Sequence, residues 1–478
     1  MIKKKIFTVL CILLLGVKAF SQKTEDDIIF RPELVLEYDS EKNYLVAFGG
    51  MLLSNSLIFS FNKYVDKASY ANVTWSDIKE HITVRGEEFD HDWYWTNFVL
   101  HPYQGSLSYL AARNCNLSWW EGMLLANIGS ILWEYAGETD WPSINDIIYT
   151  PVGAVALGEM FYRLSLEAQS YGLTWLSIFA NPQRLYTDFA LKRRPQGYTG
   201  RIYSVSTKIG FGTASAVTWL GSKKRPEFFP AMMQFELDAI YSDPYGHESD
   251  SPYSQFELEF GLASGIGSGY DVDDFDGLLH FDIHIFSNGV MYSKAVDFGE
   301  DKDTTIGIIL EYDFMWHSFM EFSDLAPGIA IKQRIKRENY NFEWQSHLDV
   351  MILGTSDFYH LTRGIVKPDR LYRDYGFCWG FEAVEKAVWK FNNGLTLNGT
   401  VHGYMVYKPE FQKQKCDDSG WDFFTFIDLS VEYNLSKRLA IGISDEIFLK
   451  QTNYKNFTDY FSVLNTFNVY GRYKPFKR

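Results

Sequence analysis

The chain has 478 residues, a formal net charge of −15 and an aromatic content of 17%. This acidity argues against nucleic acid as a partner, because an acidic surface repels a phosphate backbone, and the length allows more than one domain. Many tyrosines and phenylalanines together with a mean hydropathy of only −0.19 are more typical of a transmembrane β-barrel than of a soluble enzyme. Barrels carry aromatic girdles and distribute their apolar residues by alternation.

The first 21 residues have the form of an export signal. Lys3–Lys5 supply the positive region, Ile6–Val17 the apolar core and Ala19–Ser21 a cleavage site of the small-x-small type. The apolar run is shorter than the roughly 20 residues of a membrane-spanning helix. We therefore expect an exported protein whose mature chain begins at Gln22.

Three cysteines remain after the predicted cleavage, namely Cys115, Cys378 and Cys416. An odd and scattered set is not a disulfide framework. One bridge stays open in an oxidising compartment, but three isolated thiols are the favoured interpretation.

Residues 22–43 are a short charged lead, and residues 44–175 have the pattern of a helical module. Ser118 and Ser143 each precede an acidic residue by three positions, the capping-box arrangement that begins a helix. We predict three to five helices, the clearest over residues 93–114, 118–137 and 143–170, while residues 44–64 favour a helix over a pair of strands. Charged residues such as Glu159 interrupt the apolar runs, so helices that span the inner membrane are the less favoured alternative.

Residues 196–478 are predicted to form an antiparallel transmembrane β-barrel, which makes the whole chain an α+β protein with a small N-terminal helical bundle. Residues 279–285, for example, place apolar side chains at odd positions and polar ones at even positions, on opposite faces of a strand. Many such runs reach about ten residues, the length of a tilted membrane strand. About twelve strands are expected, an even number that suits a single-chain barrel, with centres near residues 210, 236, 258, 282, 311, 333, 347, 382, 401, 428, 443 and 467. Segments 243–250, 271–277 and 355–374 are expected to be loops, and a soluble β-sandwich is the alternative fold.

Five ordered motifs lie in the helical module. They are W-T-N-F-V-L-H-P-Y-Q-G-S (95–106), A-A-R (111–113), L-W-E-Y (132–135), P-S-I-N-D (142–146) and T-P-V-G…L-G-E (150–159). In this order they resemble a family of bacterial envelope proteins known as domain of unknown function 3943, over residues 44–170. The resemblance implies an outer-membrane-associated protein with a helical N-terminal module. It brings no established activity and no catalytic residue.

Polar residues within these motifs are the best candidates for a functional site. Asn97 and His101 are four residues apart and so are neighbours on a helix face, and Glu134 and Asp146 come from adjacent predicted helices. If the four converge, a histidine with carboxylates has the chemistry of a general acid–base pair or of a divalent-metal site. The favoured interpretation is structural, with each residue capping or bridging helices. The sequence has no G-x-S-x-G or similar nucleophile motif, which makes catalysis the less favoured role.

The predicted barrel interior supplies a weaker candidate for metal binding in His280, Asp282 and His284. At roughly 3.3 Å per residue the two histidines lie about 13 Å apart, too far to share one ion through bonds of about 2 Å. A polar lining is therefore favoured, and neither a metal nor a cofactor is predicted. Acidic positions 236, 238, 257, 259, 311 and 313 would face basic positions 332, 334 and 336, which leaves open a transverse field for ions or a plug of salt bridges.

We interpret the chain as an outer-membrane β-barrel of the Gram-negative cell envelope with a transport, channel or structural role, its helical module gating, plugging or anchoring the periplasmic mouth. The alternative is an outer-membrane enzyme that acts on lipid or lipopolysaccharide through His101 and nearby carboxylates. Expected partners are outer-membrane lipids and, during biogenesis, the barrel-assembly machinery. Nucleic acid is not expected, and the sequence identifies no small-molecule ligand.

Overall fold

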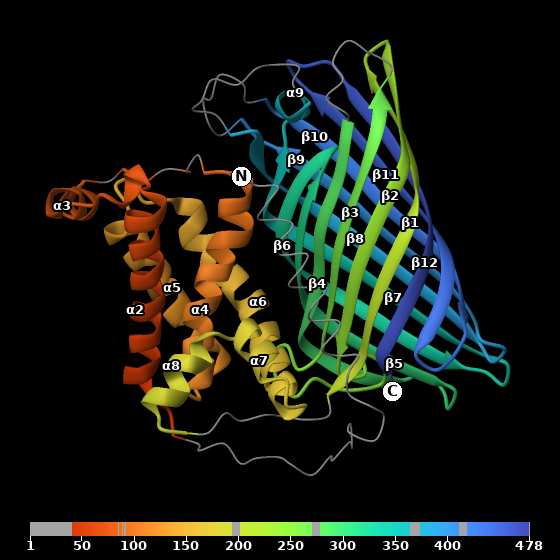
Figure 1. Ribbon diagram of the computed structural model, residues 1–478, viewed down its shortest axis with the longest axis horizontal. Helices are drawn as coiled ribbons and strands as arrows, with labels where there is room; N and C mark the ends of the chain where they lie inside the picture. Colours follow the sequence, from red (N-terminus) through yellow and green to blue (C-terminus); the bar gives the residue numbers. More distant parts are fainter. Residues whose placement is uncertain are drawn as a thin grey trace. The chain divides into compact units, whose positions relative to one another are not determined.

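Twelve antiparallel strands close into a barrel in the computed structural model of the protein (Figure 1). The structure describes residues 41–84, 86–87, 89, 92–193, 201–269, 278–363, 373–410 and 418–477. The predicted export signal, nearly all of the charged lead, the loop 271–277 and Cys416 lie outside the described residues and stay predictions.

Each predicted strand centre falls within one observed strand, so the barrel is confirmed and the β-sandwich alternative is wrong. The strands are β1 (Ile202–Leu220), β2 (Lys223–Tyr241), β3 (Phe256–Gly269), β4 (Leu278–Asp297), β5 (Lys302–His317), β6 (Met320–Lys336), β7 (Tyr340–Asp357), β8 (Tyr375–Phe391), β9 (Leu395–Lys408), β10 (Gly420–Asn434), β11 (Leu439–Tyr454) and β12 (Tyr460–Lys477). Every strand pairs with its neighbours in sequence, and β1 also pairs with β12. The barrel therefore has no free strand edge.

One loop prediction needs correction. The segment 355–374 was expected to be a loop throughout, but β7 continues to Asp357 and a short helix, α9 (Tyr359–Thr362), follows. Residues 355–357 are still paired with β8, Ser356 opposite Gly376, because ladder hydrogen bonds continue the strand even where its side chains are short and polar.

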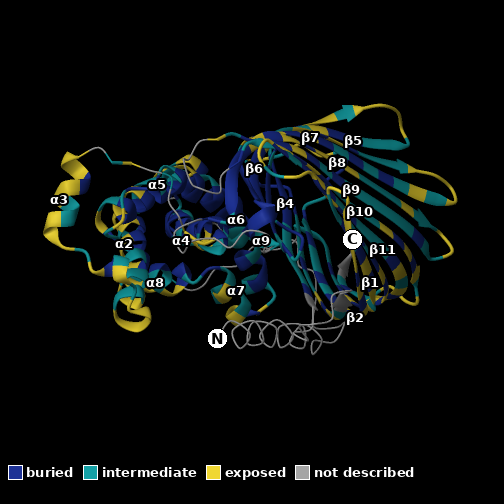
Figure 2. Ribbon diagram, turned by 90° about the horizontal axis from the view of Figure 1, so that it is seen from above, coloured by how far each residue is buried: buried dark blue, intermediate teal, exposed yellow. Residues whose placement is uncertain are grey.

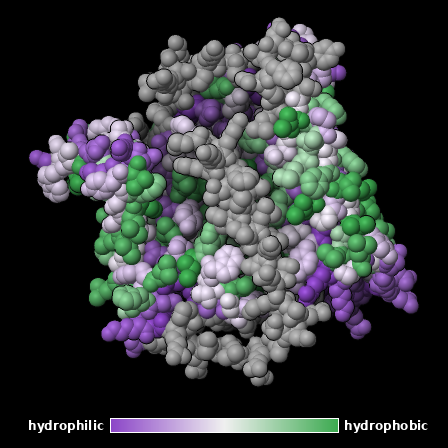
Figure 3. All heavy atoms as spheres, in the orientation of Figure 1, coloured by the Kyte–Doolittle hydropathy of each residue, from purple (hydrophilic) through white to green (hydrophobic). Residues whose placement is uncertain are grey.

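Side chains alternate between the two faces of the barrel wall. Ile329, Val350 and Phe381 on the outer face are 58%, 48% and 50% exposed, whereas many of the polar residues at the intervening positions are buried. Figure 2 shows this alternation as stripes along the strands, and Figure 3 shows apolar side chains on the outer wall, with hydrophilic residues gathered at its lower edge. An apolar outer face around a polar interior is the pattern of a barrel in a lipid bilayer.

The chain divides into two compact units. The barrel unit combines Phe89–His101 with Ile202–Arg478, and the helical unit combines Met1–Glu88 with Pro102–Arg201. The α-helices within residues 41–193 are α2 (Tyr44–Phe61), α3 (Trp75–Thr83), α4 (His101–Asn114), α5 (Trp119–Ala136), α6 (Ile144–Ser170), α7 (Thr174–Ala180) and α8 (Gln183–Ala190). Three to five helices were predicted; the additional α7 and α8 have no side-chain cap hydrogen bond, so they lack the signal that marks a helix start in sequence.

The main helices follow their sequence signals. Ser118 forms the predicted capping box with Glu121 at the start of α5, and the Ser143 side chain caps α6. The segment 44–64 is helical, as favoured, and Tyr44–Asp66 is the one described helix long and apolar enough, by length and composition, to cross a membrane. Cys115 in this unit and Cys378 in the barrel are buried free thiols.

The helix predicted over residues 93–114 is not uniform. Residues 96–100 form a π-helical turn before α4 begins at His101. Pro102 stands in the first turn of α4 and has no N–H to donate to the carbonyl of Phe98. The hydroxyl of Tyr312 donates to that carbonyl instead, at 2.6 Å. A proline and a bond from the barrel wall thus account for the widened turn.

Candidate functional site in the barrel interior

Residues 92–101, together with Phe89, lie against the outer face of the barrel wall. Outward-facing Phe314 of β5 stacks on Tyr94 with ring centroids 5.3 Å apart, and outward-facing Tyr375 of β8 meets Phe98 edge-on at 5.4 Å. Asn97 Nδ2 donates to the Tyr375 hydroxyl at 2.7 Å. Asn97, one of the predicted site residues, therefore helps to anchor this segment to the wall.

The other predicted residues of that set also have structural contacts within their own units. His101 Nε2 lies 3.9 Å from the carboxylate of Asp92. Glu134 at the end of α5 accepts a hydrogen bond from Ser143 N at 2.8 Å, and Asp146 N donates to Ser143 Oγ at 3.2 Å. The first bond joins α5 to the start of α6, and the second caps α6. Asn97 and His101 belong to the barrel unit and the two acids to the helical unit, so convergence of the four stays a prediction.

The helical unit holds a fully compensated buried charge at Glu159. Its carboxylate accepts hydrogen bonds from Tyr109 Oη at 2.7 Å and from Arg113 Nε at 2.8 Å, and it pairs with Arg163 at 2.9 Å. Burial opposes the charge, but the two guanidinium groups outweigh it and lower the pKa of Glu159. Gly158 makes room for the arrangement, because an added Cβ would lie 2.7 Å from the Tyr109 ring.

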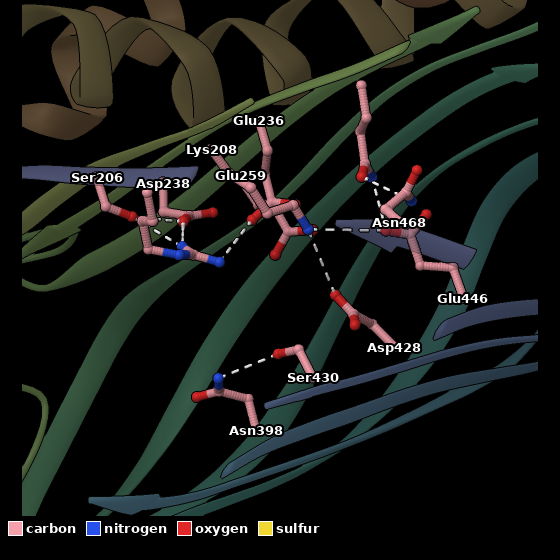
Figure 4. A network of polar contacts seen from close by, with 12 residues as sticks. Ser206, Lys208, Glu236, Asp238, Glu259, Asn398, Asp428, Ser430, Glu446 and Asn468 are labelled. Carbon is pink, nitrogen blue, oxygen red and sulfur yellow. Dashed lines mark hydrogen bonds and ion pairs between the residues drawn. The ribbon is translucent and has the colours of Figure 1, made fainter. Parts of the chain in front are cut away.

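Most inward-facing charges of the barrel are paired with one another. Arg472 of β12 contacts Glu236 and Asp238 of β2, with N–O distances of 3.3 and 2.5 Å. It also contacts Glu432 of β10 at 2.9 Å. Lys208 of β1 pairs with Glu236 from the other side (Figure 4). This network joins strands from both ends of the barrel sequence, because closure places β12 beside β1 and therefore one strand away from β2.

The basic residues predicted on β6 are paired as well. Lys332 lies 2.7 Å from Glu257 of β3. Arg334 contacts Asp303 of β5 at 2.7 Å and Asp243 at 3.1 Å. Asp243 belongs to the β2–β3 connection, whose predicted loop character is confirmed and which folds inward here. Acidic and basic residues therefore neutralise one another locally and do not form two opposed surfaces.

Between these charges, side chains of the described strands enclose two cavities. The larger has a volume of about 250 Å³ and the smaller about 80 Å³, and both are lined in part by Glu236, Glu259 and Asp428. The larger is lined by seven acidic side chains, Glu236, Asp238, Glu257, Glu259, Glu343, Asp428 and Glu432, and by four basic ones, Lys386, Lys390, Arg472 and Lys474. Acidic groups thus exceed basic ones around the space that water or a solute would occupy.

The weak metal candidates of the sequence line the smaller cavity. His284 Nδ1 is 2.9 Å from Asp282 Oδ2, and its Nε2 is 3.6 Å from Glu259. His280 packs against His317 instead, with ring centroids 5.0 Å apart. The two predicted histidines therefore have separate neighbours, and neither belongs to a group of potential metal ligands within the described part of the chain.

Apolar side chains fill the interior beside the smaller cavity. Phe322 of β6, Tyr404 of β9 and Phe424 of β10 form a ring cluster with centroids 4.5 to 4.8 Å apart, and Met315 and Met351 are buried against it. We call this set, with the other buried members of its cluster, the apolar layer. The alternation of polar and apolar residues did not reveal this layer. Where both the inward and the outward side chains of a strand are apolar, the sequence shows no period of two.

Four inward-facing carboxyl groups near the apolar layer differ from the paired charges. They are Asp313 of β5, Asp324 of β6, Asp349 of β7 and Glu382 of β8, each at most 1% exposed. No ion pair with a described lysine or arginine involves any of them, and each has at least one buried oxygen without a hydrogen-bond partner. Asp313 and Glu382 form a group of potential metal ligands with His402. Of these residues only Asp313 was predicted as an interior acid. Their proximity to one another depends on strand register, which the sequence alone does not show.

Comparisons with known proteins confirm the resemblance found in the sequence. Residues 86–182 match the family described as Domain of unknown function (DUF3943). No curated protein matches the sequence.

Among solved structures, an outer membrane channel from Pseudomonas putida F1 is similar with a TM-score of 0.30 and 10% identity, over 58% of this chain and 99% of that chain. A FadL homologue from Pseudomonas aeruginosa has a TM-score of 0.25 and 9% identity, over 58% and 91% of the two chains. OmpT, an outer membrane protein of Vibrio cholerae, has a TM-score of 0.23 and 10% identity, over 56% and 97%. At these scores the likeness assigns no function.

Proposed function

We propose that the protein is an outer-membrane β-barrel that transports small solutes through its interior, with the apolar layer as its gate. The apolar outer wall suits a bilayer, and the interior holds a polar cavity of about 250 Å³. The observation that carries the proposal is the ring cluster of Phe322, Tyr404 and Phe424. It is part of the apolar layer, whose member Phe286 lines both cavities. A hydrophobic constriction closes a pore by excluding water, so these rings would have to move for conduction.

The charge balance of the interior favours cations as the transported class. Seven acidic side chains and four basic ones line the larger cavity, and a cavity with excess negative charge concentrates positive ions. Conduction should therefore be cation-selective at moderate salt and less selective at high salt, where screening shortens the reach of the charges.

An anchoring role for residues 92–101 fits better than a plugging role. Their contacts are with outward-facing residues such as Phe314 and Tyr375. Strand residues line both cavities, and Tyr245 of the β2–β3 connection also lines the larger one. We propose that this segment ties the helical unit to the barrel, for a role at the periplasmic mouth. The enzymatic alternative through His101 is not favoured, because Asn97 and Glu134 are engaged in structural hydrogen bonds.

Planar-bilayer recording tests the gate. The wild-type barrel should conduct weakly, and the triple variant Phe322→Ala, Tyr404→Ala, Phe424→Ala should conduct severalfold more because water can then cross the apolar layer. The matched control is Phe381→Ala with Phe423→Ala, which removes two rings from the outer face and should leave conductance unchanged.

Two results would refute the proposal. If the triple variant folds, as shown by heat-modifiable mobility in gels, and still conducts no more than the wild type, the apolar layer is not a gate and a structural role replaces transport. If the protein separates with the inner membrane rather than with outer-membrane fractions, the location is wrong as well.

A further inference from the structure

We propose that Asp313, Glu382 and His402 bind a divalent transition-metal ion, with Zn²⁺ the best fit. The three residues come from β5, β8 and β9, all are buried, and one potential ligand atom from each lies within 4.8 Å of the other two. The inference concerns a binding site inside the barrel and does not depend on whether the barrel conducts.

The spacing of the ligand atoms suits a shared ion. His402 Nδ1 lies 3.5 Å from Glu382 Oε1. Two ligands bonded to Zn²⁺ at about 2.1 Å in a tetrahedral arrangement are roughly 3.4 Å apart. Glu382 is paired in register with Tyr404, and His402 with Val384, so the acid and the histidine are diagonal neighbours on the inward face of adjacent strands.

Asp313 is oriented toward this pair by a neighbouring side chain. The hydroxyl of Tyr404 donates to Asp313 Oδ2 at 2.6 Å, while Oδ1 is buried and accepts no hydrogen bond. Metal-binding carboxylates are commonly held in this way, with one oxygen in a hydrogen bond and the other available to the ion. Tyr404 thereby connects the apolar layer to the site as a positioning residue.

The unpartnered oxygens are the observation that points to a ligand. Neither carboxylate oxygen of Glu382 accepts a hydrogen bond, although the residue is only 1% exposed. A buried polar group without a partner is costly, and a buried carboxylate more so. Glu257, another interior acid, shows the ordinary solution, because Lys332 lies 2.7 Å from it. A metal cation at the proposed site would be the positive partner of Glu382, as Lys332 is of Glu257.

Two further buried acids lie near the proposed site and would also be stabilised by a cation. Asp324 is paired in register with Asp313, and both oxygens of nearby Asp349 are buried without a hydrogen-bond partner. Gly328 of β6 allows Asp349 to lie against the strand backbone, since an added Cβ would be 1.7 Å from its Oδ1. One or both of these acids would then supply a further ligand or balance the charge of the ion.

The donor set selects the class of metal. An imidazole with carboxylates suits Zn²⁺ and neighbouring transition metals, whereas Ca²⁺ and Mg²⁺ prefer sites built from oxygen alone. His402 also lines the smaller cavity, which shares lining residues with the larger one. An ion would reach the site through this polar space.

Direct metal binding tests the proposal. The full-length protein, purified in detergent and treated with a chelator, is titrated with Zn²⁺ alone, and bound metal is counted by mass spectrometry and calorimetry. The wild type should bind one equivalent, and Glu382→Gln and His402→Gln should each weaken binding at least about tenfold. The matched control is Glu343→Gln, which changes an interior acid paired with Lys390 and should bind Zn²⁺ as the wild type does.

Each outcome decides the question. Heat-modifiable mobility identifies the variants that fold, and the two ligand variants serve independently if one of them does not. Absence of Zn²⁺ binding by the wild type would mean that protons alone neutralise these carboxyl groups, and would overturn the site. Equal binding by the wild type and a folded ligand variant would overturn it too, as would a preference for Ca²⁺ that His402→Gln does not change. A barrel that binds Zn²⁺ at this site but never conducts would uphold the site and refute transport.

Discussion

Two buried glutamates, one in each unit, are treated in opposite ways. Glu159 of the helical unit is fully buried and surrounded by Arg113, Arg163 and the Tyr109 hydroxyl. Glu382 of the barrel unit is 1% exposed and has no lysine or arginine partner among the described residues, and neither of its oxygens accepts a hydrogen bond. The protein itself supplies the partners of the Glu159 carboxylate. It leaves both carboxyl oxygens of Glu382 without a hydrogen-bond partner.

The difference follows from how each fold brings side chains together. On a helix the residue four positions along is a neighbour, so Arg163 reaches Glu159 from the same helix. On strands the closest inward neighbours come mainly from adjacent strands. Around Glu382 they are an acid, a histidine and apolar residues, with no lysine or arginine paired to it among the described residues. A compensated buried charge indicates structure, and an uncompensated one indicates a candidate ligand site.

The largest expected effect comes from removing the counterion of Glu159. Arg113→Met should destabilise the helical unit by about 3–5 kcal/mol, because it leaves a buried carboxylate with too little positive charge. Urea unfolding followed by far-UV circular dichroism measures this loss. The counterpart, Glu382→Gln in chelator, should leave barrel stability unchanged or raise it, since it removes a buried carboxyl group whose oxygens have no hydrogen-bond partner. A comparable loss of stability in Arg113→Met and Glu382→Gln would show that the two buried glutamates do not differ in this way.

A smaller effect is expected from crowding the ring that holds Glu159. Gly158→Ala would place a Cβ 2.7 Å from Tyr109, and overpacking of this kind costs about 1–3 kcal/mol. The same unfolding measurement applies. The control is Gly471→Ala of β12, where an added Cβ meets no atom within 4 Å; if both alanine variants are equally stable, the tight fit around Tyr109 is not important for stability.

The smallest effect concerns Glu121 at the start of α5. Hydrogen bonds from Tyr44, Lys42 and Ser118 lower the pKa of Glu121 to about 2, against roughly 4.3 in an unfolded chain. The ionised form is the one stabilised, so its contribution is complete above about pH 4.3 and is lost as the pH falls toward 2. Glu121→Gln should flatten the acid limb of the stability profile of the helical unit, and an unchanged slope would show that Glu121 does not contribute to it.

Much of the fold could be predicted from the sequence, but little of the candidate site could. Capping residues such as Ser118 mark helix starts because they bond the first free amides, and those helices were predicted correctly. The uncapped helices α7 and α8 were not. Asn97 and Glu134 were conspicuous as polar residues in apolar runs, a pattern that structural hydrogen bonds produce as readily as a functional site does. Glu382 and His402 stand in ordinary alternating strands, so nothing local distinguishes them.

The sequence by itself determined the number of strands, their approximate centres and which residues face inward at positions such as 280, 282 and 284, because a period of two is a local property of the chain. Only the tertiary structure decided which inward residues meet. Closure of β1 on β12 brings Arg472 to Asp238. The curvature of the barrel brings Asp313 of β5 within hydrogen-bond distance of Tyr404 of β9. Strand register and barrel closure set these contacts, and both depend on hydrogen bonds between segments far apart in the chain.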